Sequence, residues 1–488
     1  EIAYSKVYAD GTQALTEKRK EIEAIAHSVK GNDLANISYT SGTTADPKGI
    51  MLSHRNYTAN VEQAMSLIEI STEDSNLIIL PLDHCFAHVA GFYTFMAYGA
   101  NVATVQRGNT PMESLKNIPL NIKEFQPTVI MSVPALAKNF RKNIESSIKA
   151  KGESTVNLFH KALRFAYDYN REGYNKKKSF FGKLKLKFYD KILFSKVRQA
   201  FGGKLNFFIG GGALLDIELQ RFFYAIGVPM LQGYGLSEAT PIISANSLQK
   251  HKLGSSGFIV ANLEIKICDE DGKELSVGEK GEIVVKGENV MLGYWKNEQA
   301  TKETIKDGWL YTGDMGYMDA DGFLYVLGRF KSLLISSDGE KYNPEGIEES
   351  IVEKTHFIDQ IVLHNNQNPY TVALAVPNIP NLKEYVTKNH PELKWDSPEA
   401  KEIALKAIQE SIDQYKGKGK YVGEFPERWR PAAIAVLPEP FTEANQMVNS
   451  TTKVVRNKVE SFYRNRIDYL YTPEGKRIIN EPNIKSLQ

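Results

Sequence analysis

The stretch LANISYTSGTTADPKG, residues 34–49, determines how the rest of the chain is interpreted. Its first part, Leu34–Ser38, has the composition of a short strand, and Tyr39–Gly49 gathers hydroxyl side chains and glycines. Such a segment exposes backbone N–H groups and O–H donors, which suit a triphosphate, and Lys48 adds a positive charge. We therefore predict a phosphate-binding loop directly after a strand.

This segment has two other possible interpretations. Gly42 and Lys48 have the spacing of a P-loop, but Pro47 stands where that motif needs Gly, and Gly49 stands where it needs Ser or Thr. A Gly/Ser/Thr-rich hairpin without a ligand would be the better interpretation of a shorter match. The full segment therefore predicts a phosphate loop of a different type.

The bulk composition narrows the class of protein. A chain of 488 residues with 42% hydrophobic residues can bury a large core and form two or three domains. The net charge of +2 predicts no nucleic-acid partner. Cys85 and Cys268 are the only cysteines, which excludes a disulfide scaffold or a cysteine-based zinc site. Residues 1–30 lack the apolar core of a secretory signal, and we expect a cytoplasmic protein.

The order of apolar segments predicts the fold class. Short apolar runs alternate with helical patterns, which is typical of an α/β domain with mixed, mostly parallel sheets. These runs are Leu77–Leu82, Val102–Val105, Val129–Val133, Phe207–Ile209 and Met230–Gln232.

After Ser255, shorter alternating segments joined by Asp-Gly turns indicate a small β-rich subdomain, and an α+β pattern follows Lys331. In the latter we predict a helix over Asn343–Lys354, strands near Ile361 and Val372, and a final helix after Thr452. The predicted division is a large domain over 1–328, with its β-rich part at about 255–328, a hinge at 329–332 and a smaller domain over 333–488.

Further motifs follow the phosphate loop along the chain. GYGLSEAT could be mistaken for a serine-hydrolase elbow, but that motif needs Gly at position 239, where Ala239 stands. In order, the motifs are LPLDHCFAH (80–88), GGGAL (210–214), GYGLSEAT (233–240), YTGDMG (311–316), GRFKS (328–332) and NSTTKVVR (449–456).

This ordered set resembles the superfamily of acyl-CoA synthetases, peptide-synthetase adenylation domains and luciferases. The resemblance implies that ATP is bound, that Tyr234 stacks on adenine and that Asp314 bonds the ribose hydroxyls. It implies Mg²⁺ on Glu238 and Thr44, and catalytic roles for Lys453, Glu238, Thr43, Lys48 and His84. The implied nucleotide contacts are Thr40, Ser41, Gly42, Thr43, Thr44, Lys48, Gly211, Gly212, Ala213, Gly233, Tyr234, Gly235, Ser237, Asp314 and Arg329.

Other implied roles concern movement and the acyl pocket. Lys331 would be the pivot of a domain rotation that brings the region around Gly339 to coenzyme A, the second substrate. His84 matches the family's pocket histidine best, and His88 is the competing choice. The NSTTKVVR loop departs from the family's usual pattern, because Ser450 stands where Pro or Gly is common.

The implied reaction is activation of a long-chain fatty acid as acyl-AMP, followed by transfer to coenzyme A. The length of the segment over 141–203 and the LPLDH wording favour long-chain synthetases over other relatives. An acyl-ACP or acyl-AMP ligase and a non-catalytic nucleotide-binding member are the alternatives. Because only 38 residues precede Tyr39, we expect the family's usual N-terminal part to be missing.

The segment at about 176–204 mixes lysines with Phe, Leu and Ile. An amphipathic helix of this composition could lie on the inner face of an anionic membrane. A solvated helical hairpin is the alternative. Nothing in the sequence indicates the oligomeric state.

Overall fold

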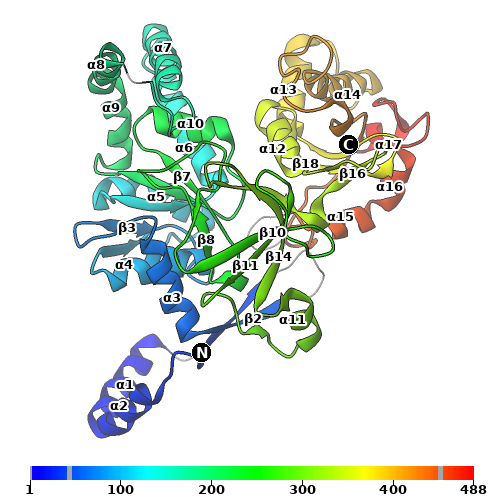
Figure 1. Ribbon diagram of the computed structural model, residues 1–488. Coiled ribbons are helices and arrows are strands. Elements are labelled where there is room, and N and C mark those ends of the chain that lie inside the picture. Colours follow the sequence, from blue (N-terminus) through cyan, green and yellow to red (C-terminus); the bar gives the residue numbers. More distant parts are fainter. Residues whose placement is uncertain (1–2, 41–46, 178, 449–453, 488) are drawn as a thin grey trace.

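The computed structural model describes residues 3–40, 47–177, 179–448 and 454–487. Its largest sheet joins strands between Ser75 and Ile259 in the order β4-β3-β5-β6-β7-β8-β9 (Figure 1). The pairs β4–β3, β3–β5, β5–β6 and β6–β7 are parallel, and the last two pairs are antiparallel. The strands are β3 (Ser75–Ile78), β4 (Asn101–Thr104), β5 (Val129–Ser132), β6 (Phe207–Gly210), β7 (Met230–Gly235), β8 (Ile242–Ala245) and β9 (Phe258–Ile259).

This sheet confirms the α/β prediction, and its strands match the apolar runs within a few residues. Helices α5 (Pro111–Phe125), α6 (Pro134–Lys149), α7 (Glu153–Asn170) and α10 (Ile217–Ala225) connect the parallel strands. The segment before β6 adds α8 (Phe180–Tyr189), a π-helical turn at Asp190–Phe194 and α9 (Ser195–Arg198).

A second sheet holds the predicted strand before the phosphate loop. Strand β1 (Leu34–Thr40) pairs antiparallel with β2 (Lys48–Ser53), which pairs with β12 (Gly293–Tyr294). Helix α3 (His54–Met65) follows β2 directly and begins with a capping box, in which Ser53 Oγ accepts from the backbone N–H of Asn56. Ahead of β1, α1 (Tyr4–Glu17) and α2 (Arg19–Ser28) form an exposed arm (Figure 1).

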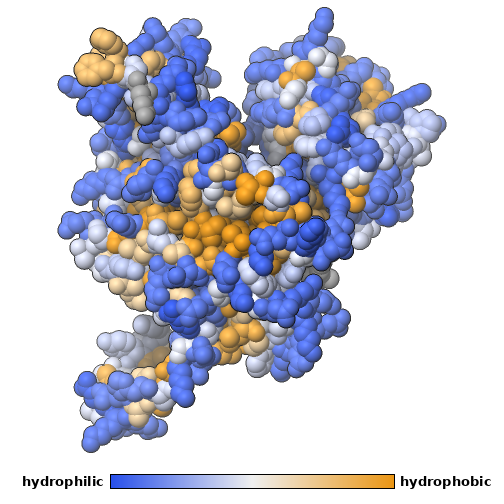
Figure 2. Space-filling model, in the orientation of Figure 1, coloured by the Kyte–Doolittle hydropathy of each residue, from blue (hydrophilic) through white to orange (hydrophobic). Residues whose placement is uncertain are grey.

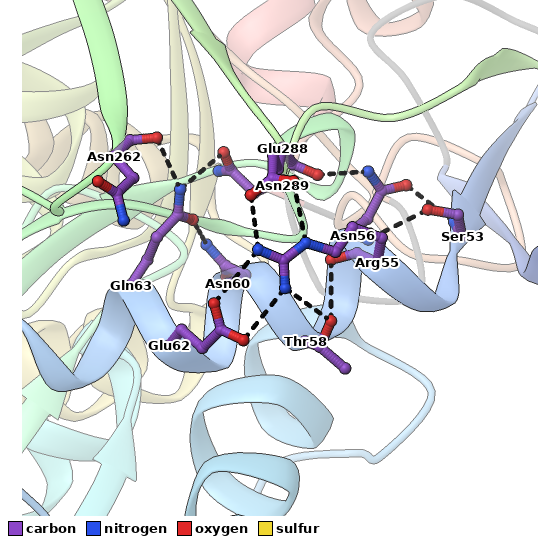
Figure 3. A network of polar contacts seen from close by, with 10 residues as sticks. All are labelled: Ser53, Arg55, Asn56, Thr58, Asn60, Glu62, Gln63, Asn262, Glu288 and Asn289. Atoms are coloured by element: carbon purple, nitrogen blue, oxygen red, sulfur yellow. Dashed lines mark hydrogen bonds and ion pairs between the residues drawn. The ribbon is translucent and has the colours of Figure 1, made fainter. Parts of the chain in front are cut away.

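One face of α3 is polar, yet it is buried against the body of the protein (Figure 3). Asn60 exchanges hydrogen bonds with the backbone of Ile242, and Asn56 donates to the carbonyl of Val290. Gln63 Nε2 donates to Asn289 Oδ1 at 3.3 Å. Buried amides with satisfied hydrogen bonds fix one arrangement of these elements, because an unpaired amide there would be costly.

The predicted β-rich part follows β9. Its sheet runs β10 (Leu263–Cys268), β11 (Gly281–Gly287), β14 (Trp309–Met318) and β13 (Ile305–Lys306), with β15 (Leu324–Arg329) also paired to β14. Gly272, Gly308 and Gly322, the second residues of the predicted Asp-Gly turns, have φ near +80°. This confirms the turn prediction, since glycine adopts that conformation readily. Helix α11 (Glu298–Thr304) precedes β13.

The last third is α+β, as predicted. Strand β18 (Ile358–His364) pairs antiparallel with β20 (Val372–Pro377), which is parallel to β21 (Ala433–Val436). A small sheet joins β16 (Leu334–Ser336), β17 (Lys341–Tyr342) and β19 (Asn366–Asn368). The helices are α12 (Glu345–Lys354), α13 (Ile379–Asn389), α14 (Pro398–Asp413), α15 (Arg456–Phe462), α16 (Arg464–Tyr469) and α17 (Glu481–Lys485).

Two helix predictions were wrong in detail. Helix α12 begins at Glu345 rather than Asn343, because Asn343 Oδ1 accepts from the N–H of Glu345 and Pro344 lies at the N-cap. A single final helix was expected after Thr452, but α15, α16 and α17 follow there. Tyr463 ends α15 with φ −96° and ψ 20°, outside the helical region.

The hydrophobic clusters in the described part of the chain divide near position 330. Three clusters contain buried residues between Ile50 and Leu324, and two contain buried residues between Leu334 and Leu487. Contacts across this division include the ion pairs Lys138–Glu349, at 3.7 Å, and Lys341–Glu270. None of the described helices has the length and apolarity needed to cross a lipid bilayer.

Candidate active site

Four strands bring the predicted nucleotide residues toward one region. Gly211 and Gly212 follow the carboxyl end of β6, and Tyr234 lies near the end of the neighbouring β7. Asp314 on β14 and Arg329 on β15 are register partners across the β-rich sheet. Ends of parallel strands commonly bind ligands, because loops with free backbone groups gather there.

Tyr234, Asp314 and Arg329 form one set of contacts. The Tyr234 hydroxyl donates to Asp314 Oδ2 at 2.6 Å, and Arg329 Nε lies 3.4 Å from Asp314 Oδ1. Burial and the Asp314 carboxylate raise the pKa of Tyr234 well above its usual range, so the phenol keeps its proton. A carboxylate can accept several hydrogen bonds, which suits it to sugar hydroxyls.

Lys48, Tyr294 and Glu238 form a second set. The Lys48 ammonium lies 4.7 Å from the centre of the Tyr294 ring, and the Tyr294 hydroxyl donates to Glu238 Oε1 at 2.9 Å. Burial and the charge of Glu238 raise the pKa of Tyr294. The backbone also joins these segments, because Met291 N donates to the Glu238 carbonyl.

Arg329 links the two sets electrostatically. Burial opposes its charge, but the carboxylates of Asp314 and Glu238 raise the pKa of Arg329. The same guanidinium acts on the phenols of Tyr234 and Tyr294. The structure thus brings Lys48, from the first predicted motif, together with residues more than 180 positions away.

At two glycines near this region, other groups of the protein lie close to where a side chain would begin. A side chain at Gly235 would place its Cβ 1.9 Å from the carbonyl oxygen of Pro241, which leaves no room. A Cβ at Gly211 would lie 3.1 Å from the ring of Phe86. The missing side chain of Gly211 leaves room for the Phe86 ring. Gly212, with φ +81°, has more open surroundings.

The two candidate histidines lie in different environments. His84 is exposed, and its Nδ1 accepts from the N–H of Phe86 at 3.2 Å. His88 is buried between the rings of Tyr57 and Tyr93, with Nδ1 2.9 Å from the Leu82 carbonyl oxygen. Burial lowers the pKa of His88, which favours the neutral ring. His84 therefore stays the predicted pocket residue, and His88 has the surroundings of a core histidine.

Several predicted site residues lie outside the part of the chain that the structure describes. Ser41, Gly42, Thr43, Thr44 and Lys453 lie outside the described residues, as do the side chains of Thr40 and Lys331. Gly233 lies on β7, and Ala213 lies in the loop after β6. Gly339 lies in the exposed loop between β16 and β17 with φ +84°.

Sequence reasoning missed Tyr294 and Cys85. Tyr294 reaches Lys48 because β12 pairs with β2, and its signal in the sequence was the short run LGYW at 292–295. The buried Cys85 thiol lies 3.8 Å from Ser38 Oγ, and burial raises its pKa. Ser237, predicted near the α-phosphate, is buried.

A magnesium site with several protein ligands is not formed by the described residues, which contain no group of three or more His, Cys, Asp or Glu side chains suited to a metal. Magnesium commonly uses one or two carboxylates together with substrate phosphates and water. Glu238, close to Lys48 through Tyr294, fits a site of that kind.

Comparisons with known proteins indicate the family of this chain. The profile of the family described as AMP-binding enzyme matches residues 3–295. Fatty acyl-CoA synthetase B of Dictyostelium discoideum is 29% identical, over 90% of this chain and 63% of that protein. A chloroplastic long-chain-fatty-acid–[acyl-carrier-protein] ligase of Arabidopsis thaliana, AEE15, is also 29% identical, over 91% of this chain and 62% of that protein.

Solved structures give the same fold. O-succinylbenzoate coenzyme A synthetase from Bacillus subtilis, in complex with AMP, aligns with a TM-score of 0.58 and 24% identity, over 88% of this chain and 70% of that chain. This likeness confirms a large α/β part followed by a smaller C-terminal part.

The family match covers more than half of the chain, which therefore belongs to the AMP-binding enzyme family. It spans about 63% of the length of the Dictyostelium relative.

Proposed function

We propose that this protein is an ATP-dependent ligase that activates a long-chain fatty acid as acyl-AMP and transfers the acyl group to coenzyme A. The observation that carries the proposal is two neighbouring sets of contacts, Lys48–Tyr294–Glu238 and Tyr234–Asp314–Arg329, which the charge of Arg329 relates. Charges placed for phosphate and for ribose suit the binding of one nucleotide. Fatty acyl relatives supply the substrate class.

The chemistry explains why such charges are needed. A carboxylate oxygen of the fatty acid attacks the α-phosphorus of ATP, a new P–O bond forms, and pyrophosphate leaves. The coenzyme A sulfur then attacks the carbonyl carbon, AMP leaves with the anhydride oxygen, and the thiol proton passes to solvent. Fixed cations stabilise the charge that develops on the phosphoryl oxygens in the first step.

Each residue has a proposed part in the first step. Lys48 neutralises phosphate charge, Asp314 orients the ribose, and Tyr234 provides an aromatic face for adenine. Arg329 holds the Asp314 carboxylate and adds positive charge beside it. Glu238 would hold Mg²⁺, which supplies Lewis-acid stabilisation of the phosphates.

The test of function is ATP–pyrophosphate exchange across fatty acids of increasing chain length. Exchange should rise from acetate to palmitate, because a longer tail buries more apolar surface in the acyl pocket. If none of the acids in the series supports exchange, acyl adenylation is contradicted. A peak at acetate would leave adenylation intact and contradict the long-chain assignment.

A second candidate acceptor follows from one relative. The Arabidopsis protein AEE15 is named an acyl-carrier-protein ligase, so acyl-ACP synthesis is the alternative to acyl-CoA synthesis. Supplying radiolabelled palmitate and ATP with either coenzyme A or holo-ACP distinguishes them. Formation of palmitoyl-CoA alone is expected, and palmitoyl-ACP alone would favour the alternative. A regulator without catalysis would give neither product and no pyrophosphate.

We further propose that the chain divides into domains at 329–332 and that Lys331 is the pivot of a rotation between the two steps. Lys453→Ala should lower acyl-AMP formation while leaving thioester formation from supplied acyl-AMP largely intact, and Lys331→Pro should do the reverse. Equal loss of both steps in either variant would contradict that residue's assigned role. A cytoplasmic location is proposed together with this activity.

A further inference from the structure

Helix α8 carries a row of apolar side chains that face away from the protein. Phe180, Leu184 and Phe188 recur at intervals of four residues and are 73%, 49% and 59% exposed, and Phe181 beside them is 82% exposed. The opposite side of the helix holds Tyr189, which is 5% exposed, and Leu186, which packs on the large hydrophobic core. The exposed row therefore contributes nothing to that core.

Lysines run alongside the apolar row. Lys183, Lys187 and Lys191 recur at the same interval of four and are all exposed, so they follow one edge of the row. Asp190 is the only acidic residue between 176 and 196, and both of its carboxylate oxygens are bound by Arg198. In the described part of the chain, Lys183, Lys187 and Lys191 form no ion pair, which leaves their charge available to an anionic ligand.

The apolar residues form a patch at one extremity of the molecule (Figure 2), where Figure 1 places α8. An exposed patch of this kind usually marks an interaction site. Lysine side chains suit a lipid surface, because their apolar stems lie along the acyl boundary while their ammonium groups reach phosphate. A dense row of lysines would instead oppose contact with a second copy of the same helix.

We propose that α8 docks the protein on an anionic lipid surface, with the row Phe180, Phe181, Leu184 and Phe188 inserted at the interface. Lys183, Lys187 and Lys191 bind the lipid phosphates. This assignment narrows the amphipathic segment expected at 176–204 to one face of α8 and of the π-helical turn that follows it. It does not depend on the proposed ligase activity.

The test is co-sedimentation with vesicles of phosphatidylcholine, with or without phosphatidylglycerol. We expect binding to the anionic vesicles, and binding at least tenfold weaker to pure phosphatidylcholine. The variant Lys183→Glu/Lys187→Glu/Lys191→Glu should lower the partition coefficient by roughly 100-fold. The control variant Lys388→Glu/Lys394→Glu/Lys418→Glu, which changes the same number of exposed charges elsewhere, should bind as the native chain does.

Insertion is tested separately from charge. Phe180→Ser/Phe181→Ser should weaken binding to anionic vesicles by roughly tenfold or more, since two aromatic rings no longer leave water. Phe462→Ser, which changes a phenylalanine that is 69% exposed on α15, should not weaken it. Circular dichroism should show all variants folded, because the changed side chains are exposed.

Three results would overturn the proposal. The first is equal binding to both kinds of vesicle, and the second is an equal loss of vesicle binding in the control variants. The third is a native chain that does not bind vesicles but forms dimers, which Phe180→Ser/Phe181→Ser dissociates. The last result would assign the patch to a second copy of the chain.

Discussion

Asp314 is the residue on which the nucleotide site can be tested most directly. Asp314→Asn removes the charge that pairs with Arg329 and weakens the acceptor of the Tyr234 hydroxyl. We expect ATP–pyrophosphate exchange to fall by about 100-fold, equivalent to about 3 kcal/mol, with a raised KM for ATP. Asp396→Asn, at an exposed position, is the matched control. An unchanged KM for ATP would mean that Asp314 only holds Arg329 in place.

For individual site residues, the ordered motifs were more informative than hydrophobic periodicity. The sequence indicated Tyr234, Glu238 and Asp314 as members of one site. In the structure Tyr234 contacts Asp314, Glu238 contacts Tyr294, and the charges of Asp314 and Glu238 both act on Arg329. It could not indicate Tyr294, because the approach of this ring to Lys48 depends on pairing between β12 and β2. Their separation of more than 240 positions hides that pairing from any local pattern.

The buried polar face of α3 allows a test at the scale of an element. Asn289 Nδ2 donates to the carbonyl of Ala239, next to Glu238, and Asn289 Oδ1 accepts from Gln63. Asn289→Ala removes both bonds in a buried region, where Gln63 Nε2 keeps only its bond to the Asn262 carbonyl, and should lower the free energy of unfolding by about 2 kcal/mol. Urea denaturation measures this loss. Asn366→Ala, at an exposed position, should change it by less than about 0.5 kcal/mol.

The buried His251 makes the stability of the protein depend on pH. Burial and the nearby Lys176 ammonium lower the pKa of His251 to about 4, and its ring packs against Tyr224 at 4.3 Å between centres. The unfolded chain, with an ordinary pKa of about 6.5, binds a proton that the folded chain does not. Stability is therefore fully present above about pH 6.5 and falls as the pH drops toward 4.

The expected size of this effect is about 2 kcal/mol between pH 7 and pH 5. His251→Gln removes the titrating group and should not show this loss. The unfolding free energy of the variant relative to that of the native chain should therefore rise by about 2 kcal/mol from pH 7 to pH 5. Chemical denaturation at the two pH values measures it. A difference that does not change with pH would show that His251 titrates normally in the folded state.

Element boundaries show where sequence reasoning stops. The strands of the main sheet were found because buried parallel strands are continuous apolar runs. The end of α15 at Tyr463 and the start of α16 at Arg464 were not found, since no glycine or proline marks the break. The polar face of α3 was also missed, because its amides bond to backbone carbonyls near positions 242 and 290.

For the whole molecule, the order of the two parts was predictable and their contacts were not. The change from α/β to α+β composition is visible along the chain. The ion pairs Lys138–Glu349 and Lys341–Glu270 join surface side chains, for which the sequence contains no signal. Contacts of this charged type are individually weak, and they leave relative motion of the two parts energetically inexpensive.

The separation of the hydrophobic clusters near position 330 has a consequence for heating. Neither part lends apolar contacts to the other part's clusters among the described residues, so the loss of one interior need not trigger the loss of the other. A calorimeter should record two overlapping melting transitions, and ATP should raise the midpoint for the larger, N-terminal part more. A single sharp peak would mean that the two parts melt as one unit.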